Sequence, residues 1–168
     1  PSLLPRHRGI NSMHWALRHG DLATGLTIFW VDAGIDTGPI LLQREVPIGI
    51  EDTVGSLYFD KLFQPGVQAM ADAVRMVREG TAPKIAQDEA QATYEPPADD
   101  ANSGIDWNAR ALDVYNLVRG SDPTPGAHAR LDDKRVRLYA ARLTLSDAIS
   151  RSPGAVLSIG STVDIELN

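Results

Sequence analysis

Cysteine is absent from the 168 residues, and aromatic residues make up only 6% of them. Without cysteine the chain forms neither disulfides nor thiolate metal sites, so a reducing cytoplasmic location is expected. No apolar run is long enough to cross a bilayer, and no signal-peptide pattern opens the sequence. These absences favour a cytoplasmic protein without a membrane partner.

Acidic residues outnumber basic ones by 22 to 16, and the net charge of −6 argues against non-specific nucleic-acid binding by the whole chain. The excess lies mostly in residues 84–103, which hold five acidic side chains and one basic one. This segment also contains Pro96-Pro97 and a stretch rich in Asp, Asn, Ser and Gly, a composition typical of a linker. We therefore predict three parts, at residues 1–83, 84–104 (the linker) and 105–168.

Hydrophobic periodicity in the first part indicates α/β structure. The expected elements are a helix over 10–19, strands over 27–31 and 40–46, and a long helix from Asp52 or Thr53 to Gly80. Pro65-Gly66 is expected to kink or divide the long helix. Its apolar residues are interpreted as core: Leu57, Val67, Met70, Val74 and Val77. An open α/β sheet needs more strands than these, so we expect this part to be the C-terminal portion of a Rossmann-like domain.

After the linker, apolar spacing predicts a helix over 111–118, ended by Gly120. Short strands are expected at 136–143, 155–159 and 163–167, separated by turns rich in Pro and Gly. This pattern favours a small, incomplete β-barrel of the oligonucleotide-binding (OB) type.

A glycine-flanked carboxylate, Asp36, follows the first predicted strand in the loop Asp32-Ala33-Gly34-Ile35-Asp36-Thr37-Gly38. Ligands of open α/β sheets bind beyond the carboxyl ends of strands, and glycines let the backbone approach a ligand closely. Loop chemistry alone leaves a structural alternative open, in which Asp32 and Asp36 merely stabilise turns.

Two blocks together decide between these interpretations: the loop at 32–38 and the opening segment Pro1-Ser2-Leu3-Leu4-Pro5-Arg6-His7-Arg8-Gly9. They resemble the formyltransferase family that uses 10-formyltetrahydrofolate, whose members carry Asn-x-His-Pro-Ser-Leu-Leu-Pro followed by Asp-x-Gly-x-Asp-Thr-Gly. Further similarity runs to Arg119-Gly120, and is greater to the hydrolase domain of 10-formyltetrahydrofolate dehydrogenase than to tRNA-formylating members. The family's histidine and asparagine would precede Pro1, so we expect a fragment without the N-terminal part.

The resemblance implies a formyltransferase-type enzyme with 10-formyltetrahydrofolate as co-substrate and no metal. Asparagine and a protonated histidine would stabilise negative charge on the formyl oxygen, while Asp36 orients the histidine and passes protons to the folate nitrogen. The residues expected to line the folate site are Val31, Asp32, Ala33, Gly34, Ile35 and Asp36. Residues expected to contact substrate are Ser2, Arg8 and Gly9.

The acceptor stays open between water, methionyl-tRNA and an amino sugar. Five basic residues of the third part could contact nucleic acid, but its neutral balance does not favour tRNA. They are Arg130, Lys134, Arg135, Arg137 and Arg142. The alternative to an enzyme is a non-catalytic fragment or binding module of the same fold. We expect residues 1–168 alone to be inactive.

Two smaller sets of residues admit a structural reading. His7, His14 and His19 are spaced by seven and five residues, which does not place them on one helical face, and no cysteine completes a zinc set. Metal binding is therefore not expected. Arg6 and Arg8 could contact an anionic acceptor, with solvated surface positions as the alternative.

Overall fold

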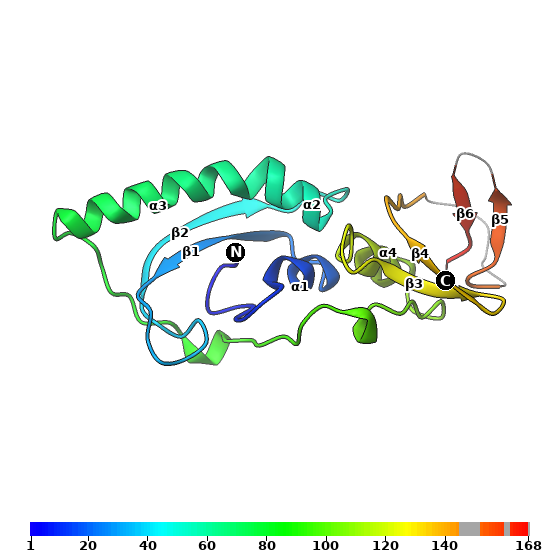
Figure 1. Cartoon of the computed structure of the whole chain (residues 1–168), viewed down its shortest axis with the longest axis horizontal. Helices are drawn as coiled ribbons and strands as arrows, with labels where there is room; N and C mark the ends of the chain where they lie inside the picture. Colours follow the sequence, from blue (N-terminus) through cyan, green and yellow to red (C-terminus); the bar gives the residue numbers. More distant parts are fainter. Residues whose placement is uncertain (145–151, 160–161, 168) are drawn as a thin grey trace.

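The structure is a computed structural model that describes residues 1–144, 152–159 and 162–167. It is an elongated molecule with two groups of elements joined by a long extended segment (Figure 1). The first group comprises α1 (Ser12–Arg18), β1 (Ala23–Phe29), β2 (Ile40–Pro47), α2 (Val54–Ser56), the π-helix η1 (Leu57–Leu62) and α3 (Phe63–Arg78). The rest comprises the 3₁₀ turns η2 (Glu89–Gln91) and η3 (Asp100–Asn102), α4 (Ala111–Arg119), β3 (Ala127–Leu131), β4 (Lys134–Leu138), β5 (Val156–Ile159) and β6 (Val163–Ile165).

The strands β1 and β2 form an antiparallel pair, with Ala23 opposite Pro47 and Ile28 opposite Leu42. Both predicted strands are present, although β1 begins four residues before the predicted start and ends at Phe29. The helix α3 packs on both strands, and α1 lies beside β1. Mixed α/β structure in the first part is thus confirmed.

A small apolar core joins these elements. Leu17 of α1, Leu57 and Leu62 are almost completely buried, and Val54 lies with them. Partly buried side chains from both strands complete the cluster, among them Leu26 and Val46. Burying each such side chain contributes roughly 1.5–3 kcal/mol, so this cluster fixes α1 and η1 against the hairpin.

The long predicted helix begins where its cap was expected. Thr53 accepts a hydrogen bond from the backbone N–H of Ser56, and the Ser56 hydroxyl accepts one from the backbone N–H of Thr53, which together form a capping box. The division of the helix occurs at η1, however, and not at Pro65-Gly66. Pro65 comes three residues after the end of η1, inside a helical run that continues from Val54 to Arg78, so the helix accommodates the proline ring and its missing N–H directly after the π-helical turn.

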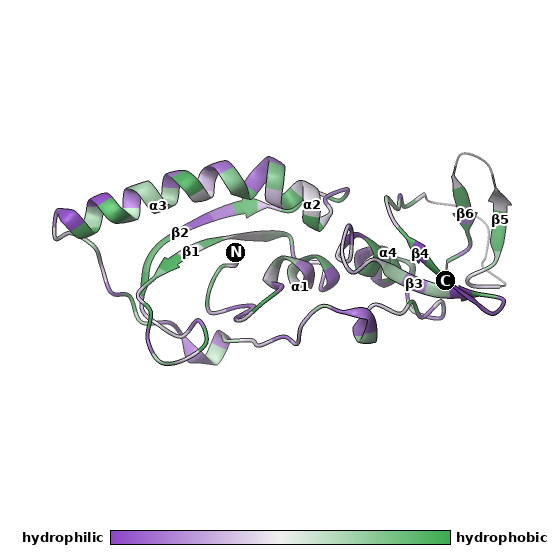
Figure 2. Ribbon diagram, in the orientation of Figure 1, coloured by the Kyte–Doolittle hydropathy of each residue, from purple (hydrophilic) through white to green (hydrophobic). Residues whose placement is uncertain are grey.

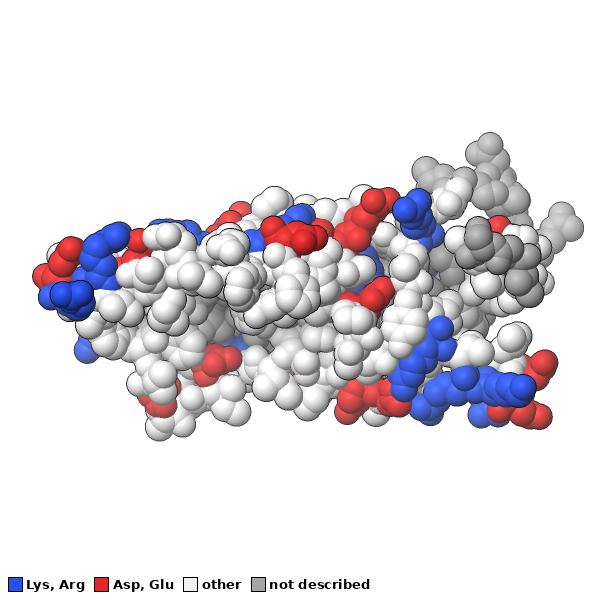
Figure 3. All heavy atoms as spheres, turned by 45° about the horizontal axis from the view of Figure 1, so that its top comes forward, with Lys and Arg blue, Asp and Glu red and all other residues white. Residues whose placement is uncertain are grey.

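One face of α3 is apolar but exposed. Ala69 and Ala73 face the hairpin and are buried, whereas Val67 is 56% exposed and Met70 52% exposed. The expectation that Val67, Met70, Val74 and Val77 are core was therefore wrong, because the small alanines are the residues that allow α3 close to the strands. Figure 2 shows the apolar bands along α3, and Figure 3 shows this side of the molecule as mostly uncharged surface.

The segment 84–104 is mostly extended and contacts both groups of elements. It forms isolated bridges with both groups, between Ile40 and Ile85, between Arg8 and Tyr94, and between Gly104 and His128. In Figure 1 it runs along the side of the first group opposite α3. Its contacts hold it against the first group, and residues 84–104 are called the strap from here on. The predicted boundaries of the three parts stay predictions.

The second group contains the predicted helix as α4 and three strand regions close to those expected. The strand predicted at 136–143 is β4, shifted to Lys134–Leu138, and it pairs with β3, which the sequence pattern did not indicate. β5 pairs with β6. Within the described residues the six strands of the molecule form three separate pairs, so the OB-type barrel stays a prediction.

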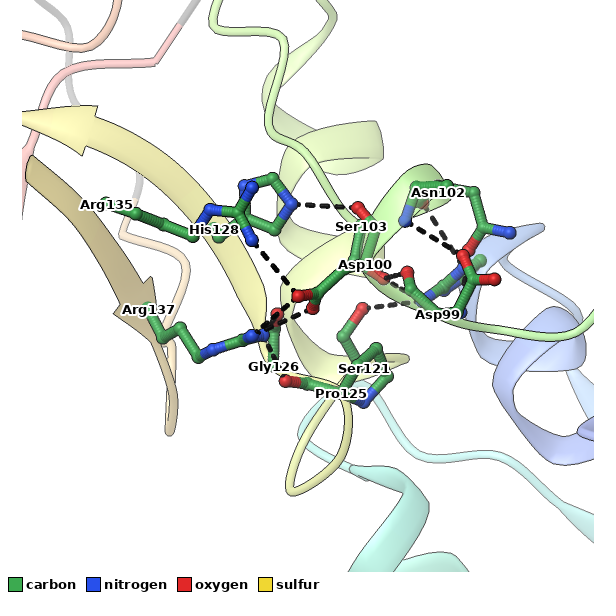
Figure 4. A network of polar contacts seen from close by, with 12 residues as sticks. Asp99, Asp100, Asn102, Ser103, Ser121, Pro125, Gly126, His128, Arg135 and Arg137 are labelled. Carbon is green, nitrogen blue, oxygen red and sulfur yellow. Dashed lines mark hydrogen bonds and ion pairs between the residues drawn. The ribbon is translucent and has the colours of Figure 1, made fainter.

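A polar network joins the strap to β3 and β4 (Figure 4). The Asp100 carboxylate pairs with Arg135 and Arg137 at 3.0 and 2.8 Å. The His128 ring bonds to the Asp100 carbonyl oxygen at 2.9 Å. The hydrogen bond from Arg137 holds the pKa of Asp100 below its ordinary value. Two of the five basic residues considered for nucleic-acid contact are thus partly neutralised within the chain.

Replacement of Thr53 by alanine removes the side-chain acceptor of the capping box. The expected result is a loss of about 1 kcal/mol in the free energy of unfolding, measured by urea denaturation. Thr144→Ala is the matched control, because Thr144 is exposed. Equal stability of the two variants would contradict the role given to the cap.

Candidate functional site

The opening segment is fixed to the hairpin by one threonine. The Thr27 hydroxyl donates to the Ser2 carbonyl oxygen at 2.7 Å and accepts from the Leu4 N–H at 3.1 Å. The Gln43 side-chain amide donates to both the Leu4 carbonyl oxygen and the Thr27 hydroxyl. The backbone of Pro1–Pro5 therefore has a defined position beside the carboxyl end of β1.

Asp36 lies against this segment. Its Oδ2 atom accepts a hydrogen bond of 2.7 Å from the Gly9 N–H, 27 residues earlier in the chain. The Asp36 side chain is half-buried, and its backbone is left-handed with φ of 55°. Such a conformation is uncommon outside glycine, and strained residues of this kind gather at ligand sites.

Asp36 and Pro1 line the same small hollow of about 110 Å³. The other lining residues are Ser2, Leu4, Gly9, Ser12, Thr27 and Phe29. The carboxylate is thus close to Pro1. A group attached ahead of Pro1 would lie beside this carboxylate.

The loop before Asp36 is held in shape by its own side chains. The Asp32 carboxylate accepts hydrogen bonds from the Gly34 N–H and from the Thr37 hydroxyl. Both bonds lower the pKa of Asp32, and the bond from the Thr37 hydroxyl has the larger effect. At Gly38 the backbone passes so close to Trp30 that an added Cβ would lie 1.6 Å from the Trp30 carbonyl oxygen. Only glycine fits there.

Apolar side chains on this loop are exposed. Val31 is 87% exposed and Ile35 66% exposed, while Ala33 and Gly34 are also at the surface. Together with Asp36 they give a short apolar edge that ends in a carboxylate. This edge is suited to a flat, largely apolar ring that carries a polar group at one end.

The strap supplies the support for this loop. The Gln87 side-chain amide donates to the carbonyl oxygens of Asp36 and Gly38, at 2.8 and 2.7 Å. Its carbonyl oxygen accepts two bonds from the Arg8 guanidinium. Gln87 therefore connects the loop to the opening segment.

Arg8 is buried and engaged within the chain. Its guanidinium also bonds to Glu89 and Tyr94, and the hydrogen bond with Glu89 raises the pKa of Arg8. A solvated position for Arg8 was therefore wrong, because the strap covers it. Its substrate contact stays a prediction.

The structure brings most of the predicted site together. Ser2, Gly9 and Asp36 share one hollow, and residues 31–35 are exposed on the loop that leads to Asp36. Sequence reasoning missed Gln87, since a single glutamine in a polar segment carries no local signal of its partners. It also missed a convergence of His7 and His19, whose rings are 5.6 Å apart. Helical spacing did not apply to them, because His7 lies in a loop before α1.

In the residues that the structure describes, no helix combines the length and apolar character that a membrane crossing requires.

Two family models match the chain. Formyl transferase matches residues 1–74, and formyl transferase, C-terminal domain, matches residues 98–166. Cytosolic 10-formyltetrahydrofolate dehydrogenase of Xenopus laevis is 44% identical over 144 residues, which are 86% of this chain and 16% of that protein. Methionyl-tRNA formyltransferase of Moorella thermoacetica is 38% identical over 159 residues, 95% of this chain and 50% of that protein. The chain thus spans about a sixth to a half of these relatives.

Solved structures agree in fold. A HypX variant from Aquifex aeolicus superposes with a TM-score of 0.80 at 23% identity, over 99% of this chain and 29% of that one. An N-formyltransferase from Helicobacter canadensis, in complex with folinic acid and dTDP-3-aminofucose, gives a TM-score of 0.65 at 25% identity, over 71% of this chain and 44% of that one.

Gln87→Glu tests the support of the loop. The glutamate keeps the oxygen that Arg8 binds but replaces the amide donor by a second carboxylate oxygen, which repels the Asp36 and Gly38 carbonyls. Amide hydrogen exchange across residues 31–38 is expected to accelerate about tenfold or more, since about 1.4 kcal/mol of local stability is a factor of ten. Gln64→Glu, at an exposed position of α3, is the control. Unchanged exchange in Gln87→Glu would contradict the assigned support.

Proposed function

Because this chain belongs to the formyl transferase family, we propose that it contributes Asp36 to a site for folate-dependent formyl transfer or formyl hydrolysis. The observation that carries the proposal is the hydrogen bond between the Gly9 N–H and the Asp36 carboxylate, which joins the two motif blocks at one hollow. The activity proposed is that of the whole protein that contains this sequence.

The exposed edge of the loop fits a folate. Val31 and Ile35 offer apolar surface to a pteridine ring, and the backbone groups of Asp32–Ile35 lie beside them to bond its polar edge. The Helicobacter canadensis relative with a comparable fold is a complex with folinic acid, which supports a folate co-substrate for this chain. We propose 10-formyltetrahydrofolate as the formyl donor.

The chemistry follows from the position of the carboxylate. An acceptor oxygen or nitrogen attacks the formyl carbon, the bond from that carbon to the folate nitrogen breaks, and one proton moves from the acceptor to the folate nitrogen. In the family motif a histidine stands immediately before the proline that is Pro1 here. Asp36 lies at the same hollow as Pro1, so it would orient that imidazole and relay the proton as a general base and acid.

Water is the acceptor that we propose first. Identity to the 10-formyltetrahydrofolate dehydrogenase of Xenopus laevis, 44%, exceeds the 38% identity to the methionyl-tRNA formyltransferase. The basic residues that could contact tRNA are in part occupied, since Arg135 and Arg137 pair with Asp100 and Arg130 lies near Asp133. An amino sugar is the second alternative, in line with the Helicobacter canadensis relative.

The exposed face of α3 also fits this assignment. Its apolar side chains border a hollow of about 390 Å³ whose lining includes Leu26 and Leu62. This chain covers 29% of the HypX structure that shares its fold, so such relatives contain further segments that could cover this face. We propose that other strands and helices of a Rossmann-like catalytic domain pack there.

Asp36→Asn in the full-length protein tests the assigned role. Asparagine keeps an oxygen for the Gly9 N–H but carries no charge and relays no proton, so kcat is expected to fall by roughly 10²–10⁴-fold. The measurement is the turnover of 10-formyltetrahydrofolate. Asp113→Asn is the control, because Asp113 lies on α4 and pairs with Arg110. Undiminished turnover by Asp36→Asn rejects the proposal.

Residues 1–168 made alone are expected to show no turnover of 10-formyltetrahydrofolate. The reason is that the family's asparagine and histidine, which would stabilise the charge on the formyl oxygen, are not part of this sequence. The same assay measures it, with the full-length protein as the positive control. Turnover by the 168 residues would show that Asp36 acts without those partners.

A further inference from the structure

A second cluster of titratable side chains lies where the strap crosses the N-terminal segment. His7, His19 and Glu95 each offer one ligand atom, and these atoms all lie within 4.8 Å of one another. They come from three places in the chain: the loop before α1, the C-cap of α1, and the strap. None of them belongs to the hollow at Asp36.

The distances match a metal-ligand set before any ion is added. The His7 Nδ1 atom is 3.3 Å from the Glu95 Oε1 atom, and the His19 Nδ1 atom is 3.9 Å from the same oxygen. Zinc bonds to nitrogen and oxygen are about 2.0–2.2 Å, so ligand atoms around a tetrahedral zinc ion lie about 3.3 Å apart. The His7–Glu95 distance equals this value, and the His19–Glu95 distance is longer.

Asp21 provides the outer contact that histidine ligands usually have. Its Oδ2 atom lies 2.9 Å from the His7 Nε2 atom, on the side of the ring away from Glu95. A carboxylate there fixes the tautomer that carries its proton on Nε2 and leaves the Nδ1 lone pair free for a metal. Arg6 bonds the other Asp21 oxygen at 2.9 Å and holds that carboxylate in position.

We propose that His7, His19 and Glu95 bind a divalent transition-metal ion, with Zn²⁺ as the best fit. Two imidazoles and one carboxylate are the donor set that zinc accepts readily, and Mg²⁺ or Ca²⁺ would prefer oxygen alone. His7 and Glu95 are largely buried, whereas the side chain of His19 is 45% exposed. The exposed side leaves a fourth position for water or for a ligand from solution.

A metal at this point would fasten the strap. Glu95 is flanked by Tyr94, whose hydroxyl accepts from Arg8, and by Pro96, whose carbonyl oxygen accepts from the Trp15 indole. The same strap carries Gln87, which supports the loop at Asp36. Binding of the ion to the folded state alone raises the free energy of unfolding.

A simpler arrangement competes with the metal. A protonated His7 between Asp21 and Glu95 would account for the contacts at both ring nitrogens. In that arrangement His19 is a second, longer ionic partner of the same Glu95 oxygen, at 3.9 Å, whereas a shared ion makes it a ligand. The two arrangements differ in whether the cluster binds a metal ion at all, and in whether that binding depends on His19.

Isothermal titration of the full-length protein with Zn²⁺, after treatment with a chelator, tests the site. His19→Ala is the first variant, because His19 is exposed and its loss does not disturb the core. The expected result is that this variant binds Zn²⁺ about 100-fold more weakly, or not at all, at the site. Co²⁺ is a second probe, because its visible absorption reports a four-coordinate site containing histidine.

Two further variants complete the test. Asp21→Asn is expected to weaken Zn²⁺ binding by about 10–100-fold, as loss of an outer contact does. His128→Gln is the control, since His128 lies at the strap's other end, on β3. Circular dichroism checks that each variant is folded. Absence of Zn²⁺ binding by the unaltered protein, or equal binding by His19→Ala and His128→Gln, overturns the proposal.

Discussion

The hydrogen bond from the Gly9 N–H to the Asp36 carboxylate is the contact on which the candidate site depends. It connects a loop that follows β1 to a segment that begins at the chain's first residue, and its length of 2.7 Å leaves the carboxylate little freedom. The left-handed backbone at Asp36 turns the side chain back toward Gly9. A hydrogen bond to an ionised acceptor contributes roughly 1.5–3 kcal/mol, enough to offset the cost of that backbone conformation.

Residues of the strap support the Gly9–Asp36 contact. Gln87 fixes the carbonyl groups on either side of Thr37, and Arg8 fixes Gln87, so the two motif blocks are joined twice. Six residues further along the strap, the Thr93 hydroxyl accepts a hydrogen bond from the His7 backbone N–H. A segment whose composition is typical of a linker thus forms part of the structure around the candidate site. Its polar side chains have partners in the fold, and composition alone does not reveal partners.

The elements that depend on local sequence were predictable. β2 and α4 lie where the apolar patterns placed them, and Thr53 caps the helix as its side chain and position indicated. The position of Asp36 beside the opening segment agrees with the motif resemblance. In each of these cases the determining interactions lie within a few residues, or within a motif shared with a family.

What could not be predicted depends on contacts between distant segments. The amphipathic pattern of α3 does not say which of its two apolar faces meets the strands, and the small residues Ala69 and Ala73 take that place. β3 was missed because its buried residues, Ala127 and Ala129, give a weak strand signal. The meeting of His7 with His19 depends on a loop conformation that spacing along a helix does not describe.

A crystal structure of the full-length protein with a bound folate tests the central claim most directly. The account predicts a pteridine ring against Val31–Ile35 and an Asp36 carboxylate that still accepts from the Gly9 N–H. The same carboxylate is expected to face the position immediately before Pro1, where the family motif has a histidine. A folate bound elsewhere, or an Asp36 side chain turned away from Gly9 toward solvent, would contradict it.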